Sequence, residues 1–429
     1  MKFKSSISNI LLIVFIILEC YFLFYTKGKL EQTTNATLYA GCSLLIGLIL
    51  LYKFQGAEVE SATTNNKVGS NKILSFVLLI AGITPLAYMA ILENNAITQF
   101  PLDHRQSDVI PMVQHMVQRL LTGEYVYKPI YDFGYMLSPT YMPLHWMPFA
   151  IAETMHFDYR WMAFILWSIA AAILIIQTFK TNNYAVKLLT PIGLYLFYYN
   201  IFLHDKTVIG NTVELTIAAY YMLLVVGINK SSAIATGIAF TLCLMSRYSL
   251  VLWLPLWFFV MMVSGERTYA IKTTGIVVML VIIVYVLPFL SKDPHIYGNT
   301  ISQYLRAAIG EWEHINPSNG KPYQLYSGTG FAHLFYEKLH DWRLEDAIKR
   351  LQKVHFLLTA GTSVILGIWY WFNRHKINNR IFLMASFKIY FTIFLAFIQV
   401  PYVYLMIVAN FVSIALFTEQ MRYRIVSYK

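Results

Sequence analysis

Residues 101–149 read PLDHRQSDVIPMVQHMVQRLLTGEYVYKPIYDFGYMLSPTYMPLHWMPF. This is the one long hydrophilic run before residue 291, and it directly follows an apolar segment. Asp103 and Asp108 lie near its start, so both acids would stand where a chain leaves a bilayer and meets water. That placement indicates a site at a membrane interface.

The composition favours a membrane protein. Of the 429 residues, 57% are hydrophobic and 13% are charged, and the mean hydropathy is +0.53. This apolar content exceeds what a soluble core needs, so lipid is the expected solvent for most of the chain. The formal charge is +11, but the basic residues are dispersed among apolar runs and form no dense block. We therefore interpret the positive charge as the excess of Lys and Arg that orients a protein in the membrane, and we expect no nucleic-acid partner.

The apolar runs predict the fold class. A bilayer core takes about 20 apolar residues per helix, and the first run has no small-residue cleavage pattern after it, so we keep it as a helix. The chain is predicted to be an all-α integral membrane protein with about 12 transmembrane helices. The predicted spans are 10–25, 38–52, 73–92, 161–179, 188–203, 212–228, 233–245, 250–263, 273–290, 356–372, 381–400 and 402–417.

Cations set the predicted orientation. Segment 139–155 contains three prolines, His145 and Glu153, and its apolar core is short, so we expect it to lie flat rather than to cross. Two large loops, 93–158 and 291–354, then face the outer side, and both chain ends face the cytoplasm. The cations then expected inside are Lys2, Lys4, Lys53, Lys67, Lys72, Lys180, Lys187, Lys230, Arg267, Lys272, Arg374, Lys376, Arg380, Arg422, Arg424 and Lys429.

The first outer loop is predicted to begin with an amphipathic helix. Ser107 or Asp108 can cap it, an early proline is tolerated in its first turn, and Gly123 can end it. Its apolar stripe, opposite a polar face, predicts a helix that rests on the membrane surface, with segment 141–153 as its partner. The stripe consists of Ile110, Val113, Val117, Leu120 and Leu121.

The order of motifs in this loop resembles a known family. Asp108 precedes the surface helix, Leu-Leu-Thr-Gly-Glu-Tyr-Val-Tyr follows at 120–127, and Ser-Pro-Thr-Tyr-Met-Pro stands at 138–143. This order is similar to that of the GT-C glycosyltransferases, and most similar to the glycosyltransferase family 87 mannosyltransferases. Weaker similarities are Val-Ile-Gly-Asn-Thr-Val-Glu-Leu at 208–215, Met-Ser-Arg-Tyr at 245–248 and Tyr-Ser-Gly-Thr-Gly-Phe-Ala-His-Leu at 326–334.

The resemblance implies an organisation of the chain into four parts. Residues 1–72 would form an N-terminal hairpin with a cytoplasmic linker, and 73–290 a catalytic transmembrane module that includes outer loop 93–158. Residues 291–354 would form the second outer loop, and 355–429 the C-terminal helices. The lipid bilayer, a polyprenyl-linked sugar donor and a glycan or glycolipid acceptor are the expected partners.

The resemblance also implies roles for particular residues. Asp108 would be the general base that takes the proton of the acceptor hydroxyl, and its place at a helix start helps to keep it ionised. The leaving phosphate would be held by cations. The expected phosphate-binding residues are Arg247, Lys206, His204 and His333. The expected acceptor-binding or sugar-binding residues are Asp103, Glu214, Asn211 and Tyr141.

Each role has a structural alternative. Asp108 could act only as a helix cap, Asp103 could be a solvated loop acid, and Glu214 could pair with Lys206. Lys388 and Glu19 lie within other spans and are expected to snorkel or to pair. The late-loop histidines, including His340, are surface residues by default. No cofactor or metal is expected, since the spacing of Asp103, His104, Asp108 and His115 matches no strong ligand pattern.

Other functions remain open from sequence. An O-antigen polymerase or ligase would also have about a dozen spans, and it would depend on arginines of the late loop such as Arg306 or Arg343. A transporter would carry charges and broken helices near the bilayer midplane, whereas here the polar residues gather at the outer edge. The expected location is the bacterial cytoplasmic membrane, with the site on the outer face, and a eukaryotic chain would instead present that face to a lumen.

Overall fold

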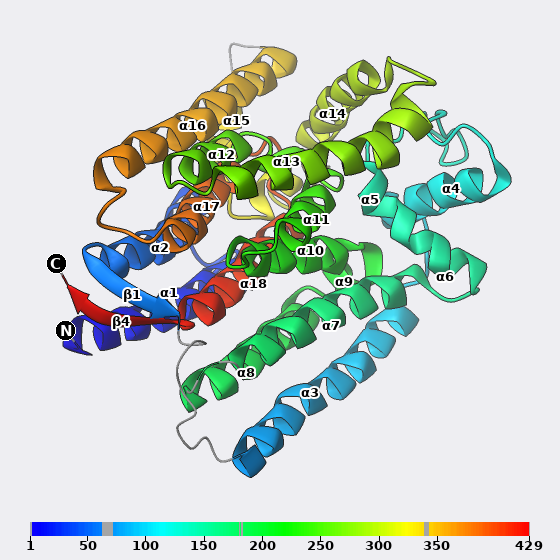
Figure 1. The fold of residues 1–429 in the computed structure, drawn as a ribbon. Coiled ribbons are helices and arrows are strands. Elements are labelled where there is room, and N and C mark those ends of the chain that lie inside the picture. Colours follow the sequence, from blue (N-terminus) through cyan, green and yellow to red (C-terminus); the bar gives the residue numbers. More distant parts are fainter. Residues whose placement is uncertain (1, 62–71, 180, 182, 339–342, 429) are drawn as a thin grey trace.

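The computed structural model describes residues 2–61, 72–179, 181, 183–338 and 343–428. The chain is mainly α-helical (Figure 1). Lys67, Lys180, His340 and Lys429 lie outside the described residues. The longest helices are α1 (Lys2–Phe24), α2 (Gln32–Phe54), α3 (Lys72–Gln99), α7 (Tyr159–Thr178), α8 (Tyr184–His204), α13 (Arg267–Val281) with its π-helical continuation η3 (Ile282–Leu290), α16 (Leu344–Asn373), α17 (Asn379–Ala396) and α18 (Val403–Gln420).

Nine helices within the described ranges are long and apolar enough to cross a membrane, judged by length and composition. They correspond to nine of the predicted spans, so the coarse prediction of an all-α chain with membrane-type helices agrees with the structure. The other three predicted spans form the shorter helices α10 (Glu214–Ile228), α11 (Ala233–Leu244) and α12 (Leu254–Val263). At about 1.5 Å per residue these reach about 15–23 Å, less than a bilayer core of about 30 Å. Twelve spans therefore stays a prediction.

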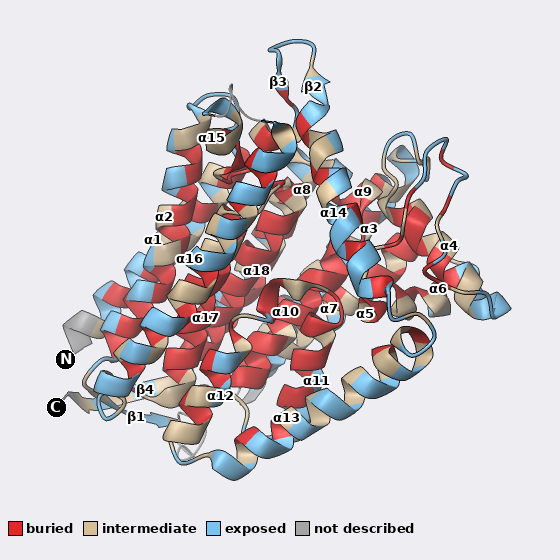
Figure 2. Cartoon of the chain, turned by 90° about the horizontal axis from the view of Figure 1, so that it is seen from above, coloured by how far each residue is buried: buried red, intermediate tan, exposed pale blue. Residues whose placement is uncertain are grey.

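Helices α10 and α18 form the centre of the bundle. Both are apolar on all sides, as expected of a helix covered all round by protein, and nearly every residue of each is buried. Helix α10 packs against α7, α11 and α18, and α18 also contacts α1 and α8. Figure 2 shows buried residues concentrated in these two helices and exposed residues along α13 and α14 (Ile296–Glu313).

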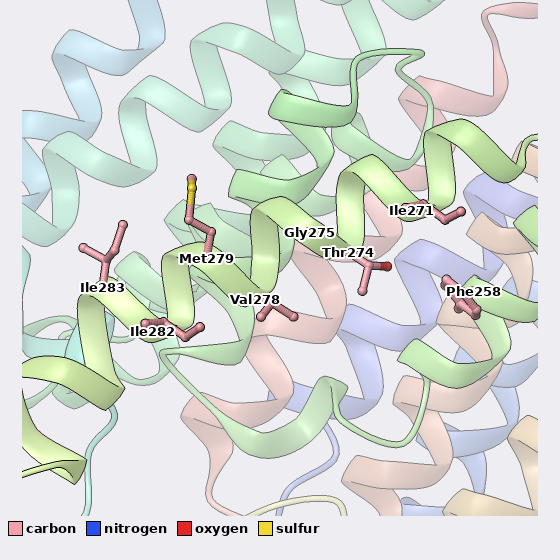
Figure 3. Close-up of a pocket in the computed structure, with 8 residues that line it drawn as sticks. All are labelled: Phe258, Ile271, Thr274, Gly275, Val278, Met279, Ile282 and Ile283. Atoms are coloured by element: carbon pink, nitrogen blue, oxygen red, sulfur yellow. The ribbon is translucent and has the colours of Figure 1, made fainter.

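The peripheral helices expose apolar side chains instead. Ile365 of α16 and Ile271 of α13 are 67% and 60% exposed, which suits helices whose outer face meets lipid. A shallow groove lies on this face between α12 and α13 (Figure 3). Its lining is apolar except for one threonine and consists of Phe258, Ile271, Thr274, Gly275, Val278, Met279, Ile282 and Ile283.

The loops gather at two ends of the bundle. At one end, strand β1 (Ala57–Ser61) pairs antiparallel with β4 (Tyr423–Tyr428), and the Gly56 N–H donates to the Lys376 carbonyl at 2.6 Å. At the other end, Tyr125 Oη of the first predicted outer loop donates to Asp293 Oδ2 of the second at 2.7 Å. The first end therefore collects loops with predicted inner cations, and the second collects both large loops.

The second end also holds the short elements of the chain. Segment 139–155 contains α5 (Pro143–Trp146), η1 (Met147–Phe149) and α6 (Ala150–Thr154), none of which is long enough to span a bilayer. The remaining short elements are α4 (Val109–Thr122), α9 (Lys206–Asn211), η2 (Tyr248–Leu250), β2 (Ile315–Asn316), β3 (Lys321–Pro322), η4 (Gln324–Tyr326) and α15 (Ala332–Glu337).

Helix α4 is the predicted amphipathic helix, with two differences in detail. It ends at Gly123, whose φ of 77° is a conformation that glycine adopts without strain. Its buried stripe packs against α5, η1 and α6, which are the partner segment expected from sequence (Figure 1). Leu121, a predicted stripe residue, is 48% exposed. The Asp108 side chain makes no capping hydrogen bond, so capping does not explain this acid.

Gly328 lies where segment 326–334 crosses the α17–α18 connection. A Cβ at this position would stand 1.6 Å from the Pro401 carbonyl oxygen, and the Gly328 carbonyl accepts from Gln32 Nε2 at 2.5 Å. We expect Gly328→Ala to lower the free energy of unfolding by about 1–3 kcal/mol, because the backbone must shift. Thermal unfolding of the purified protein in detergent measures this. Gly310→Ala is the matched control, since a Cβ there meets nothing within 4 Å. Equal melting temperatures for the two variants would contradict the close approach.

Candidate functional site

Asp108 immediately precedes α4 and faces the second end of the bundle. Its Oδ2 accepts a hydrogen bond from Tyr135 Oη at 2.9 Å. Burial and the Asp108 charge together raise the pKa of Tyr135, so this phenol stays protonated as a donor. Ser107, not Asp108, accepts at the helix start, from the Val109 N–H at 3.4 Å. The carboxylate of Asp108 is thus oriented by a tyrosine of its own loop.

Arg247 lies in the break between α11 and η2, in extended backbone with φ −150° and ψ 148°. Its Nη2 donates to Glu214 Oε2, at the start of α10, at 2.5 Å. The Glu214 side chain is 3% exposed and that of Arg247 is 24% exposed. Glu214 therefore pairs with Arg247, and not with Lys206 as the alternative from sequence had it. A short charge-assisted contact of this kind fixes both side chains.

Helix α5 covers this ion pair. The Leu144 N–H donates to the Met245 carbonyl at 2.8 Å, and Tyr220 Oη donates to the Leu144 carbonyl at 3.1 Å. His145 of the same helix stacks on Tyr141, with ring centroids 4.0 Å apart, and burial lowers the pKa of His145. A neutral imidazole is expected there, because the Arg247 charge also opposes its protonation.

A third carboxylate reaches the region from α14. Glu311 Oε1 accepts from Tyr402 Oη at 2.9 Å. The neighbouring Trp312 is buried, and its Nε1 donates to the Gln399 carbonyl at 2.9 Å, which fixes this turn of α14 on the α17–α18 connection. Burial raises the pKa of Glu311, and the negative charge of Asp108 adds to that effect while Tyr402 opposes it. Asp108 and Glu311 therefore share one electrostatic environment.

Tyrosine side chains connect Asp108 with Arg247. Tyr141 interacts electrostatically with both charged groups, and so does Tyr404. The Tyr404 ring stacks on Tyr402 at 4.9 Å and lies 5.9 Å from the Arg247 guanidinium carbon. We name this set the outer polar cluster. It comprises Asp108, Tyr135, Tyr141, Glu214, Arg247, Glu311, Tyr402 and Tyr404.

The structure brings together some of the site residues predicted from sequence and leaves others apart. It brings Asp108, Tyr141, Glu214 and Arg247 into the outer polar cluster, whereas Asn211 contributes through its carbonyl, which accepts from Ser107 Oγ at 3.0 Å. Asp103 is 37% exposed, and its Oδ1 accepts from the Arg105 N–H at 2.9 Å.

The other three predicted cations lie elsewhere at this end. The His204 ring packs 4.3 Å from that of Tyr25, and Lys206 Nζ donates to Gln99 Oε1 at 3.2 Å. His333 is buried against α2, with Nε2 3.0 Å from Thr33 Oγ1 and Nδ1 3.0 Å from the Gly330 carbonyl. Both ring nitrogens of His333 are thus engaged within the protein.

Sequence reasoning missed Tyr135 of the Asp108 loop, and it also missed three residues from far along the chain, Glu311, Tyr402 and Tyr404. They come from α14 and from the start of α18, about 200 to 300 residues after Asp108 in the chain. Within those segments each looks like an ordinary loop acid or interfacial tyrosine. No local pattern marks them, because only the packing of α14 on the α17–α18 connection brings them to Asp108.

Arg160 binds two backbone segments that contact the loop carrying Asp108. Its guanidinium pairs with Asp158 and donates to the carbonyls of Phe100 and Gly210 at 2.6 and 2.9 Å. Phe100 ends the segment before the 101–108 loop, and Gly210 belongs to α9, to which Ser107 also bonds. The Arg160 side chain is 4% exposed. This buried charge pair therefore ties α3, α7 and α9 together around the loop that carries Asp108.

For the base role that the sequence predicts for Asp108, Arg160→Gln should slow turnover by about 100-fold, because a misplacement of about 1 Å costs that much. Arg160→Lys should be milder, since it keeps the charge beside Asp158. The turnover of folded, monodisperse protein measures the effect. In a protein that already carries Asp108→Asn, Arg160→Gln should reduce turnover little further, as expected of a residue that acts through Asp108. A fully additive loss would instead show a general loss of structure.

Across the part of the chain that the structure describes, no three His, Cys, Asp or Glu side chains come together closely enough to hold a metal ion.

Comparisons with known proteins leave the chain without an assigned relative. No protein-family model matches it. A search of curated proteins finds no match either.

Proposed function

We propose that this protein is a membrane glycosyltransferase that moves a hexose from a polyprenyl phosphate sugar to a lipid-linked or cell-envelope glycan. The supporting observation is that Asp108, free of a capping role, lies in one tyrosine-lined cluster with the partly buried cation Arg247. A base and an anion-binding cation in one cluster suit transfer away from a phosphate leaving group. The motif order around Asp108 supports the same reaction.

The proposed mechanism has one chemical step. The acceptor hydroxyl oxygen attacks C1 of the sugar, and its proton passes to Asp108. The bond between C1 and the phosphate oxygen breaks, its electron pair stays on the phosphate, and Arg247 stabilises that charge. Tyr135 donates to Asp108 and keeps the carboxylate directed at the acceptor. Inversion at C1 follows from the direct attack.

The proposed location follows from the two ends of the bundle. The predicted inner cations gather at the end of the bundle that holds β1 and β4, and α4, α5 and α14 lie away from that end (Figure 2). From the positive-inside rule, we propose that the cluster faces the outer side of a bacterial cytoplasmic membrane.

One experiment tests the proposal directly. The purified protein in nanodiscs is incubated with a panel of radiolabelled polyprenyl phosphate hexoses, with the mannose donor first, and the release of free polyprenyl phosphate is scored. Release with one donor that disappears in Asp108→Asn would support the proposal. Release that persists in this variant, or silence across the panel, would argue against it.

The two alternatives have separate tests. A polymerase or ligase would lose activity on substitution of Arg306 or Arg343, both of which are exposed in the late loop. A transporter would take labelled substrate into proteoliposomes without forming a covalent product. The buried Lys388–Glu19 pair is one feature of the described bundle that favours transport, and Glu93, a buried acid of α3, is another. The polar atoms of the Lys388–Glu19 pair are satisfied by protein, since Ser413 and the Ala409 carbonyl complete it.

A further inference from the structure

The Arg247–Glu214 pair has unused hydrogen-bonding capacity. Glu214 Oε2 accepts from Arg247, but Glu214 Oε1 is buried and has no partner within the described structure, and the same holds for Arg247 Nε. Buried polar atoms are normally hydrogen-bonded. The two unsatisfied atoms of this ion pair therefore indicate that it can take a further hydrogen-bonding group.

The charges around the pair indicate what kind of ligand it is. The outer polar cluster contains three carboxylates, Asp108, Glu214 and Glu311, and one cation, Arg247. Tyr404 interacts electrostatically with each of these four groups. Of the three, Glu214 alone is in direct contact with the guanidinium. An arginine offers five N–H donors, and Glu214 engages only one side of the fork. A second anion on the other side of the fork would lie close to the Glu214 carboxylate, whose negative charge opposes its binding.

We propose that Glu214 is the resident counter-anion of Arg247 and that its charge weakens the binding of a phosphate monoester to the same guanidinium. This inference rests on the proposed function, because it identifies the charge that the donor's phosphate meets at Arg247. Glu214 Oε2 contacts Arg247 Nη2 and so compensates the guanidinium charge. A phosphate at the remaining N–H groups would share the guanidinium with Glu214, and the two anions would repel each other. Glu214 thereby sets the affinity of the site, so that the leaving group can depart after transfer.

The test measures phosphate binding without any sugar. The full-length protein in phosphatidylcholine nanodiscs is titrated with decyl phosphate below its micellar concentration, with decanol as the neutral control. Inorganic phosphate in a parallel titration distinguishes a lipid-borne headgroup from a free anion. Glu214→Gln should bind decyl phosphate at least about tenfold more tightly than the wild type, because the competing charge is gone. The variant should also gain a larger increase in melting temperature from the ligand.

Two further variants keep the test decisive if Glu214→Gln does not fold. Glu214→Asp keeps the charge but shortens the side chain, so it should bind about threefold more tightly than the wild type, as a weakened contact allows. If Glu214→Gln does not fold, this variant decides the question. The Arg247→Gln/Glu214→Gln pair leaves no buried charge and should lose binding of decyl phosphate.

The outcomes separate this inference from the proposed function. Equal or weaker binding of decyl phosphate by Glu214→Gln would overturn the inference, and so would retained binding in the double variant. If Glu214→Gln binds decyl phosphate more tightly but no sugar donor releases polyprenyl phosphate, the inference stands and the glycosyltransferase proposal fails. If sugar is transferred but Glu214→Gln binds decyl phosphate no more tightly than the wild type, the proposal stands and the inference fails. Stronger binding of inorganic phosphate than of decyl phosphate would show that a free anion is the ligand.

Discussion

Replacing Asp108 with asparagine is expected to reduce sugar transfer by about 10²–10⁴-fold, the usual contribution of a general base. The amide has the same shape and can still accept from Tyr135, but it cannot take a proton from the acceptor hydroxyl. Since the Asp108 side chain makes no capping bond, α4 loses nothing by the change. The rate constant under saturating donor and acceptor is the quantity to measure.

Asp103→Asn is the matched control for this prediction. Asp103 stands five residues earlier in the same loop, and its Oδ1 makes only local contacts, a hydrogen bond from the Arg105 N–H and a 3.8 Å approach to His104 Nδ1, among the contacts of the described chain. We expect its turnover to stay within about twofold of the wild type, as for most exposed positions. A loss in Asp103→Asn equal to that in Asp108→Asn would show that the loop as a whole matters, and not the base.

The second large effect concerns the charge pair inside the bundle. Lys388 Nζ of α17 donates to Glu19 Oε1 of α1 at 2.7 Å, Ser413 Oγ of α18 donates to Glu19 Oε2 at 2.6 Å, and both charged side chains are fully buried. Lys388→Met is expected to lower the free energy of unfolding by about 3–5 kcal/mol, because it leaves the Glu19 carboxylate buried without its cation. Denaturant titration in mixed micelles measures the loss.

The double variant distinguishes pairing from packing. Lys388→Met combined with Glu19→Leu removes both charges at similar volume, and replacing a whole buried pair is often neutral or stabilising. We therefore expect the double variant to recover most of the lost stability. Equal destabilisation in the single and double variants would mean that the long side chains contribute by packing alone. Transfer activity should follow the amount of folded protein, since the pair lies outside the outer polar cluster.

Local sequence information predicted the elements of this fold. Apolar runs of about 20 residues predicted the nine long helices, because a membrane-type helix satisfies its own backbone and needs only an apolar surface. The stripe at 110–121 and Gly123 predicted α4 and its end, since spacing and a left-handed glycine act within a few residues. Other features stayed open. Lys388 and Glu19 could have snorkelled, and their pairing required α1 and α17 to meet α18.

The sequence by itself determined that this is an all-α chain of membrane-type helices with an acid at the start of an amphipathic helix. Only the tertiary structure decided what that acid faces. Asp108, Arg247 and Glu311 stand on three separate segments, and Glu214 takes Arg247 as its partner although Lys206 is far nearer in the chain. Helix formation depends on neighbours within one or two turns, whereas a charged cluster depends on which segments pack together. The site is therefore a property of the packing of α4, α10, α14 and α18, and no single stretch of sequence contains it.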